Sequence, residues 1–156
     1  GWFVRSLSGE QYALPEAVEM LHAARNLIAA REKPIALSAI DPANPYGAVI
    51  PGCGIAREAG NVIVVRAGRV IAGLQGRAMI TGEGEVDDES FSAAVAALMT
   101  LKPRITIDSI DGVPALESPR VGILAAMRVH SDGRSLVFDG LHGPAPARAS
   151  RRRSSN

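Results

Sequence analysis

The chain has 156 residues, 47% of them hydrophobic and 21% charged, so it has the composition of a globular protein and enough length for one core. Its single cysteine, Cys53, excludes an internal disulfide, and the three histidines are too scattered for a zinc site. No apolar run reaches the roughly 18 to 20 residues that cross a bilayer, and the first residues lack the order of a signal peptide. We therefore expect a cytoplasmic chain with no membrane contact and no metal centre.

The net charge of +1 conceals an uneven distribution. Four of the 17 basic residues lie within 148–153, whereas all 16 acidic residues precede them, so residues 1–147 hold 13 basic against 16 acidic residues, a net charge of −3. This pattern predicts a folded part over residues 1–140 and a disordered basic tail over 141–156. Because the folded part is not basic overall, contact with nucleic acid would need a local group of lysines or arginines.

The first half of the chain predicts a strand, a helix, a second strand and a long loop. The apolar run at residues 2–4 predicts the first strand, and apolar residues at helical spacing after Pro15 predict a helix that ends near Ala30. Residues 35–40 form the second apolar run. The prolines, glycines, Asp and Asn of residues 41–60 then predict a loop, and long loops inside compact domains are often functional.

The second half begins with the clearest hairpin signal in the chain. Two valine- and isoleucine-rich runs flank Arg66-Ala67-Gly68-Arg69, so we predict antiparallel strands with Gly68 at positive φ. A further short strand is expected at 77–81, with a bulge or bend marked by Gly73 and Gly76.

Two more helices and two more strands follow. The acidic start at 87–90 and an apolar stripe of Phe91, Ala94, Val95, Leu98 and Leu101 predict a helix that Pro103 ends. Alternation predicts a strand over 104–110, and Ser118-Pro119 predicts a helix that runs to about Met127 and buries Val121, Leu124 and Ala125. A last strand is expected at 136–138. The fold class is α+β: a mixed or antiparallel sheet with about three helices, forming an incomplete part of a larger accessory domain.

The usual catalytic motifs are missing from the sequence: it has no phosphate-binding loop, no dinucleotide fingerprint, no His-Glu-x-x-His and no nucleophile elbow. The carboxylates of Asp87, Asp88 and Glu89 are explained by helix capping. Asp111 is explained by a turn with Gly112, and Asp108 by a solvent-facing position on a strand. Cys53 lies between glycines with no basic sequence neighbour that would activate a thiol. We therefore predict no catalytic residue in this chain.

Arginines near aromatic residues offer the best candidates for nucleic-acid contact, because arginine binds phosphate and an aromatic face stacks on a base. The candidates are Trp2, Arg5, Gln11, Tyr12, Arg66, Arg69 and Arg77. Three of them have an alternative explanation: Trp2 would pack in a core, and Arg66 and Arg69 would be solvated at a hairpin tip.

Three stretches of the sequence are distinctive and occur in a fixed order. Residues 6–21 contain Ser-Gly-Glu-Gln-Tyr-Ala-Leu-Pro-Glu-Ala-Val, which resembles a passage near the end of the core region of the Lhr family of large helicase-related proteins. Residues 38–47 are similar to its Ser-Ala-x-Asp-Pro-x-Asn-x-x-Gly loop, and 110–115 with Ser118-Pro119 to its Ile-Asp-Gly-x-Pro-Ala…Ser-Pro segment. The chain departs from the family at Arg128-Val129, where Gly-Phe is common.

The resemblance implies a superfamily 2 helicase with two motor domains, a winged helix and a C-terminal accessory domain around single-stranded nucleic acid. This chain would be a fragment, the last part of the accessory domain. ATP and Mg²⁺ would bind upstream motor domains, so no cofactor is expected here. The implied role is in DNA repair, with a DNA or RNA strand and the upstream domains as partners. The accessory domain of the family resembles a DNA glycosylase fold, but the Gln-x-Gln motif is absent, so no glycosylase activity is expected.

Two other interpretations stay open at this point. The chain could be a structural scaffold whose apolar surface packs on the motor and winged-helix domains. It could also be a small enzyme that uses the loop of residues 41–54 as its site.

Overall fold

The computed structural model describes residues 9–25, 33–82, 84, 86–127 and 129–139. The predicted strand at residues 2–4, the predicted end of the first helix near Ala30 and the basic tail lie outside these residues. Within them the chain is α+β, as predicted, with helices and both mixed and antiparallel sheets.

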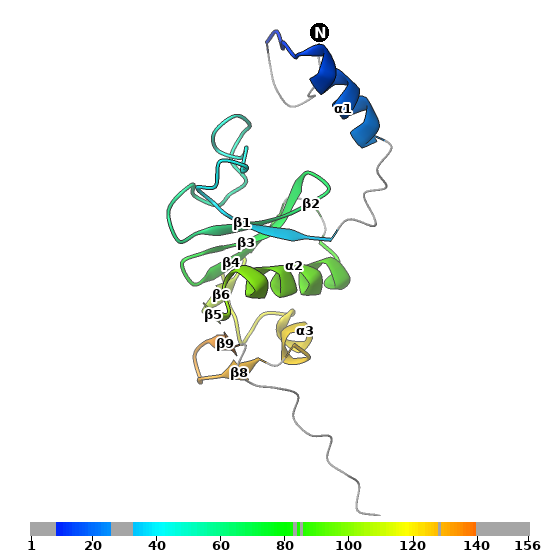
Figure 1. Cartoon of the computed structure of the whole chain (residues 1–156). Helices are drawn as coiled ribbons and strands as arrows, with labels where there is room; N and C mark the ends of the chain where they lie inside the picture. Colours follow the sequence, from blue (N-terminus) through cyan, green and yellow to red (C-terminus); the bar gives the residue numbers. More distant parts are fainter. Residues whose placement is uncertain (1–8, 26–32, 83, 85, 128, 140–156) are drawn as a thin grey trace, which may run out of the picture.

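Helix α1 (Pro15–Arg25) begins at the predicted proline, with Glu16 in its first turn. Met20 and Leu21 on this helix are 73% and 41% exposed, and Leu14 just before it is 72% exposed. Figure 1 shows α1 apart from the sheet and from the other helices. The helix therefore forms from local signals and adds little to the core described below.

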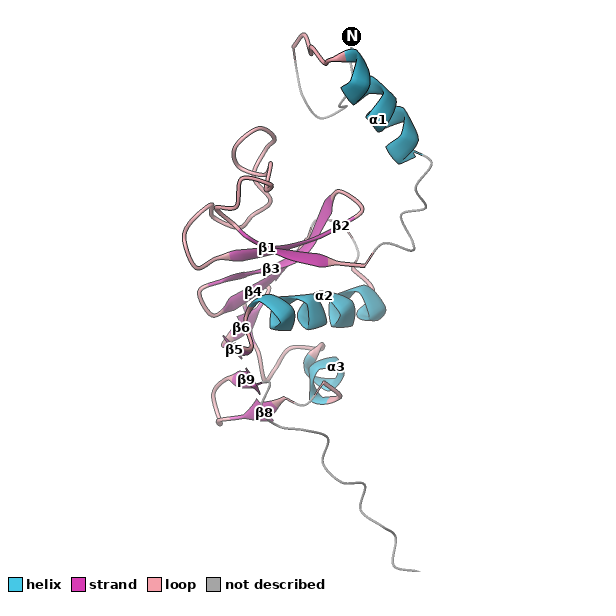
Figure 2. Ribbon diagram, in the orientation of Figure 1, coloured by secondary structure: helices cyan, strands magenta, loops and turns pink. Residues whose placement is uncertain are grey.

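The main sheet has the strand order β1-β2-β3-β4-β6-β7. Its pairs are antiparallel except for the parallel pair of β4 with β6. The strands are β1 (Ile35–Ser38), β2 (Val62–Arg66), β3 (Arg69–Gln75), β4 (Ala78–Thr81), β6 (Ser109–Ile110) and β7 (Val113–Pro114). Figure 2 shows α2 (Asp88–Leu101) lying along this sheet.

The predicted strand over residues 104–110 is divided between two sheets. β5 (Arg104–Ile107) pairs with β9 (Leu136–Asp139), which also pairs with β8 (His130–Ser131), whereas β6 joins the main sheet. The change occurs at Asp108, whose backbone N–H donates to the carbonyl of Arg77 at 2.8 Å. Alternation along a sequence does not specify which partner a strand takes, so this division was not predictable.

Helix α2 matches its prediction closely. The carboxylate of Asp87 caps it by accepting a hydrogen bond from the N–H of Ser90 at 2.6 Å, and the helix ends before Pro103. Phe91, Ala94, Val95, Ala97 and Leu98 are buried, whereas Leu101 is 46% exposed, so the apolar stripe is covered only as far as Leu98.

Helix α3 (Val121–Ala125) is shorter than predicted. Leu124 is buried but Ala125 is exposed, which corrects the expected buried face. Arg120 fixes this segment beside α2, because its guanidinium lies 4.5 Å from the centre of the Phe91 ring and donates to the carbonyl of Val86 at 2.8 Å.

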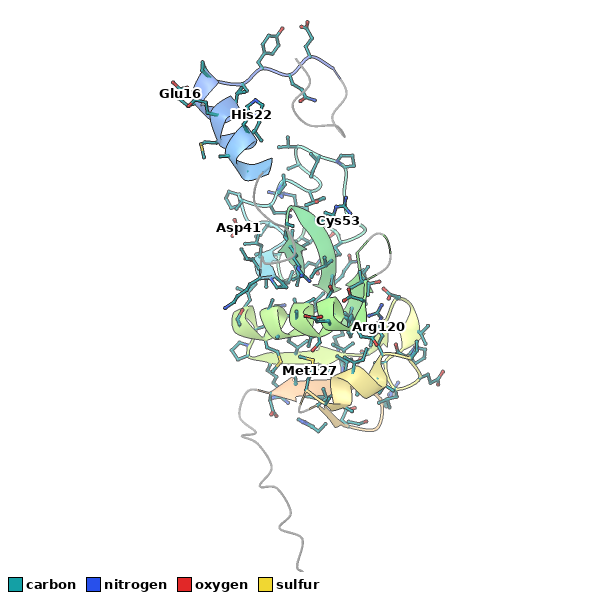
Figure 3. All side chains as sticks on the ribbon, turned by 90° about the vertical axis from the view of Figure 1, so that its right-hand side faces the viewer. Glu16, His22, Asp41, Cys53, Arg120 and Met127 are labelled. Atoms are coloured by element: carbon teal, nitrogen blue, oxygen red, sulfur yellow. The ribbon has the colours of Figure 1, made fainter. Side chains whose placement is uncertain are left out.

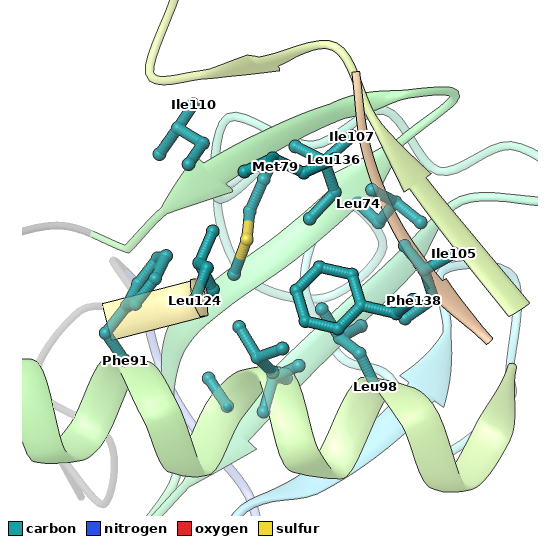
Figure 4. Packing of buried hydrophobic residues seen from close by; sticks show 14 of the residues in the cluster. Leu74, Met79, Phe91, Leu98, Ile105, Ile107, Ile110, Leu124, Leu136 and Phe138 are labelled. Carbon is teal, nitrogen blue, oxygen red and sulfur yellow. The ribbon is translucent and has the colours of Figure 1, made fainter. Parts of the chain in front are cut away.

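The β2–β3 part of the main sheet is buried on both faces. Val62, Val64, Ala72, Leu74 and Met79 belong to the large cluster with α2, whereas Ile63 and Val70 pack with Ile55 of the loop on the other face. Figure 4 shows Leu98, Met79 and Phe138 pointing into one space between α2 and the strands. This burial explains why residues 62–65 are continuously apolar rather than alternating.

Gly73 lies inside continuous β3 and is not at a bulge; the register shift of this hairpin falls at Val64/Val65 instead. A Cβ atom at Gly73 would lie 2.1 Å from Cδ1 of Ile55 and 2.6 Å from the carbonyl oxygen of Val62. Gly73 therefore permits the close approach of the loop to the sheet. Gly76, by contrast, has a φ of 59° in the turn that connects β3 to β4, as a bend requires.

The hairpin prediction is confirmed, including positive φ at Gly68 (73°). Ala67 shares this conformation at 49°, so both central turn residues are left-handed, which is the geometry of a type I′ turn. Asp111 and Gly112 repeat it, at 51° and 80°, between β6 and β7.

Replacement of Gly73 by alanine should destabilise the fold by roughly 1–3 kcal/mol, because Ile55 or the β2 backbone must move to admit the new methyl group. The matched control is Gly122→Ala in α3, where the added Cβ meets nothing within 4 Å and φ is not positive. That change should be neutral or slightly stabilising. Urea unfolding of both variants measures the difference; equal stabilities would contradict the packing role of Gly73.

The cap of α2 should make stability depend on acidity. The hydrogen bond from the backbone of Ser90, followed by that from its side chain, holds the pKa of Asp87 below its ordinary value. The ionised Asp87 carboxylate therefore stabilises the folded state fully above the unfolded pKa of about 3.9. This stabilisation is lost as pH falls through the lower pKa of the folded state.

Asp87→Asn should keep the cap, because asparagine also caps helices, but asparagine does not titrate in this range. The free energy of unfolding should therefore fall less steeply in this variant as pH is lowered. The free energy of unfolding, measured by urea at a series of pH values below about 5, tests this. Asp88→Asn leaves the Asp87 cap in place and is the control. If the free energy of unfolding falls as steeply with pH in Asp87→Asn as in the unmodified chain, the Asp87 cap does not contribute to this pH dependence.

Candidate nucleic-acid interface

The loop of residues 41–60 has a defined shape that Asn44 holds from within. Asn44 is only 2% exposed. Its side-chain amide donates to the carbonyl of Ala39 at 2.7 Å, and its side-chain oxygen accepts from the N–H of Tyr46 at 3.0 Å. Asp41 makes a local turn by accepting from the N–H of Ala43 at 2.8 Å. The polar residues of this segment therefore build the loop.

Arg57 closes the same loop from its other end. Its guanidinium donates to the carbonyl oxygens of Asn44 at 2.7 Å and Asp41 at 3.3 Å, with a longer contact of 3.5 Å to that of Tyr46. A planar guanidinium can satisfy several carbonyls at once, which a lysine cannot do with the same geometry. The two ends of the loop are joined by this one side chain.

A pocket of about 340 Å³ lies between the loop and the tip of the β2–β3 hairpin. We call it the Tyr46 pocket; it is lined by Tyr46, Ile50, Pro51, Gly52, Cys53, Arg69 and Val70. The Tyr46 hydroxyl donates to the carbonyl of Gly68 at 2.7 Å and so ties the loop to the hairpin. Figure 3 shows Asp41 and Cys53 on the loop side of the sheet, away from Arg120 and Met127.

The three hairpin arginines have different surroundings. Arg66 donates to the hydroxyl of Ser90 at 3.0 Å, and Arg77 forms an ion pair with Asp108 at 2.8 Å and donates to the hydroxyl of Ser135 at 3.0 Å. Arg69 is exposed, and no acidic side chain in the described ranges pairs with it. Arg69 is thus the hairpin arginine best placed to bind an external anion.

Arg77 is also remote from the other two. It follows β3, which begins at Arg69 and has seven residues, so a strand length of about 20 Å separates Arg69 from Arg77. A single phosphate cannot contact both. The structure therefore brings Arg66 and Arg69 to one hairpin tip, as directly paired residues, and leaves Arg77 at the opposite end of the strand.

The other predicted contact residues are placed as follows. Trp2 and Arg5 lie outside the described residues. Tyr12 is 87% exposed before α1, and its hydroxyl donates to Glu10 at 2.6 Å, a bond that raises the pKa of the phenol. Gln11 is half-buried beside it. Both belong to the segment before α1, not to the Tyr46 pocket.

The carboxylates have structural roles; Asp111 lies in a turn, as the sequence indicated, whereas Asp108 lies between β5 and β6 and not on a strand. Asp111 accepts hydrogen bonds from the backbone N–H of Thr81 at 2.7 Å and from its hydroxyl at 2.9 Å, and thereby joins β4 to the β6–β7 turn. Asp108 is exposed and engaged by Arg77 and Ser135. Across the residues that the structure describes, no group of three or more His, Cys, Asp or Glu side chains could hold a metal ion.

The sequence did not point to Tyr46 or Arg57, and it showed no basic neighbour for Cys53, whereas Arg69 lines the same pocket. Tyr46 could have been suspected as an aromatic residue among turn formers. Nothing in the sequence indicated that Arg57 would bond to the other end of its own loop or that Arg69 would lie beside that loop, because both contacts depend on how the loop folds over the sheet.

No protein-family model matches the chain. The chain is 31% identical over 138 residues to a Mycolicibacterium smegmatis protein described as Lhr helicase/probable uracil glycosylase. That match covers 75% of this chain but only 9% of the other protein. The chain is therefore distantly related to a segment of a far longer protein with a helicase name, in agreement with the resemblance seen in the sequence.

None of the helices within the described residues is long and apolar enough to cross a membrane.

Arg57→Met should loosen the loop while keeping the apolar stem of the side chain. Loss of hydrogen bonds from a charged donor should cost about 1.5–3 kcal/mol, and amide hydrogen exchange across residues 41–60 should become faster. Arg69→Met is the matched control, because it makes the same chemical change at an exposed site. Unchanged exchange in Arg57→Met would show that Asn44 alone suffices to hold the loop.

Proposed function

We propose that this chain is an accessory segment of an ATP-dependent DNA or RNA helicase or translocase, and that it contacts the single strand on which that protein acts. The observation that carries the proposal is the distant relationship to a segment of a protein named as a helicase. In this proposal ATP and Mg²⁺ act in motor domains elsewhere in the parent protein. The chain itself performs no catalysis and takes part in DNA repair through its parent.

The hairpin tip and the Tyr46 pocket support contact with a strand. Arg69 is exposed and offers a guanidinium that can bind phosphate, and the aromatic ring of Tyr46 lies beside it in the same pocket. Proteins that hold single strands combine these two features, because phosphate contact supplies affinity and stacking is tolerant of sequence. The structural carboxylates described above lie outside this pocket.

A second candidate function is a scaffold that packs on other domains of the parent protein. The exposed apolar side chains at α1 favour it, since Met20 and Leu21 on the helix and Leu14 just before it are uncovered. The third interpretation, an enzyme built on residues 41–54, gains nothing from the loop, because Asp41 and Asn44 are engaged in holding its shape.

The chain should bind labelled single-stranded DNA weakly, with an affinity that falls as salt rises from about 50 to 200 mM, because phosphate contacts release counterions. Arg69→Ala should weaken binding and reduce the salt slope by about 1. Arg104→Ala, an exposed arginine on β5, is the matched control and should bind like the unmodified chain. Fluorescence anisotropy measures both quantities.

Absence of binding by the folded chain at low salt would overturn the direct contact and favour the scaffold. Equal losses in Arg69→Ala and Arg104→Ala would show that charge alone, and not the hairpin tip, attracts the strand.

A further inference from the structure

The Tyr46 pocket has a composition that phosphate contact does not explain. Ile50, Pro51 and Val70 give it apolar walls, Tyr46 adds an aromatic ring, and none of the described residues that line it is acidic. Its volume of about 340 Å³ lies within the range of small-ligand sites, which is about 300–1,000 Å³. Such a site suits a flat, uncharged ring system rather than a cation or a sugar.

The pocket is also held in shape before any ligand arrives. Tyr46 is fixed at its backbone N–H by Asn44 and at its hydroxyl by the carbonyl of Gly68. Arg57 holds the carbonyls of Asn44 and Asp41 within the loop. Because these residues are already ordered, a ligand would lose less binding free energy to ordering the site.

Arg69 places a positive charge at the same site. It is exposed, while Val70, the next residue, lies in the wall of the pocket and packs with Ile55 and Ile63. The pocket thus joins an apolar, aromatic cavity to a cationic side chain that can reach solvent. A nucleotide within a strand has the matching parts, a flat base and a phosphate anion next to it.

We propose that the Tyr46 pocket receives one unpaired nucleobase of a single strand, with Arg69 binding an adjacent phosphate. The inference rests on the proposed strand contact and adds the site at which a base is held. Recognition is by shape and stacking, so the pocket accepts different bases; no side chain with an amide or carboxylate lines it to read base edges. A paired base cannot enter, because its faces and edges are covered within the duplex.

The first test uses the unmodified chain and three strands of equal length: normal DNA, DNA with abasic sites throughout its centre, and the matching RNA. Abasic DNA keeps the phosphates and removes the bases. Base stacking contributes enough that the abasic strand should bind about 5- to 150-fold more weakly at one salt concentration. RNA binding like DNA would show that the pocket does not distinguish the sugar, and RNA binding tighter than DNA would identify RNA as the source of the base.

The second test compares two changes at Tyr46. Tyr46→Phe keeps the ring but loses the hydroxyl bond to Gly68 that holds the pocket in shape, so it should bind normal DNA more weakly than the unmodified chain but still more tightly than abasic DNA. Tyr46→Ala should lose affinity to about the abasic level. Only Tyr46→Ala should remove the difference between normal and abasic DNA, a readout that a general loss of stability does not reproduce.

Cys53 gives a direct report of occupancy. It is the single cysteine of the chain, is half-buried and lines the pocket. Saturating normal DNA should slow its alkylation by a thiol reagent several-fold, whereas saturating abasic DNA should not. Cys53→Ser confirms that the signal comes from this residue.

The outcomes separate this inference from the proposed function. Salt-sensitive binding with equal affinity for normal and abasic DNA, and with no protection of Cys53, would overturn base capture and leave the strand contact standing. Absence of binding to every strand by the folded chain would overturn both.

Discussion

Burial of the β2–β3 hairpin on both faces is the constraint on which the other parts of the structure depend. α2 covers one face, and the loop of residues 41–60 covers the other through Ile55. The second contact needs Gly73, since any side chain there would collide with Ile55. The loop is consequently part of the folded core, and its exposed surface, including the Tyr46 pocket, is carried by a packed sheet. A site on such a support keeps its geometry better than one on an isolated loop.

Local signals predicted most elements, and long-range contacts account for what they missed. Pro15, the acidic residues before Phe91 and the Arg66–Arg69 turn were sufficient to place two helices and the hairpin, because the interactions that start and end these elements are close in sequence. The division of residues 104–110 between two sheets could not be read in this way, since Asp108 is positioned by Arg77. The Tyr46 pocket was missed for the same reason: its lining comes from two segments that approach only when the loop folds onto the sheet.

The residues that carry the family resemblance have structural roles in this chain. Asn44 is buried and bonded within the loop, and Asp111 with its left-handed backbone fastens one turn to β4. These positions preserve a shape, and they explain why the motifs identify a relationship without indicating a reaction. Tyr46 and Gly47 close the second of the three stretches, residues 38–47, and its final glycine has a φ of 72° that the turn requires. Contact with a ligand would instead depend on side chains at the ends of the motif and beyond it.

The way in which Arg57 holds the loop has a consequence for ionic strength. Its partners are backbone carbonyls at short range and partly buried, not carboxylates. Dissolved ions screen separated, exposed charges far more than such short contacts. The loop should therefore keep one conformation from dilute buffer to concentrated electrolyte, while any attraction between Arg69 and an anion weakens. Arg57 thus maintains the conformation of the loop, whereas Arg69 attracts an anion. The two properties can therefore change independently in sequences related to this one.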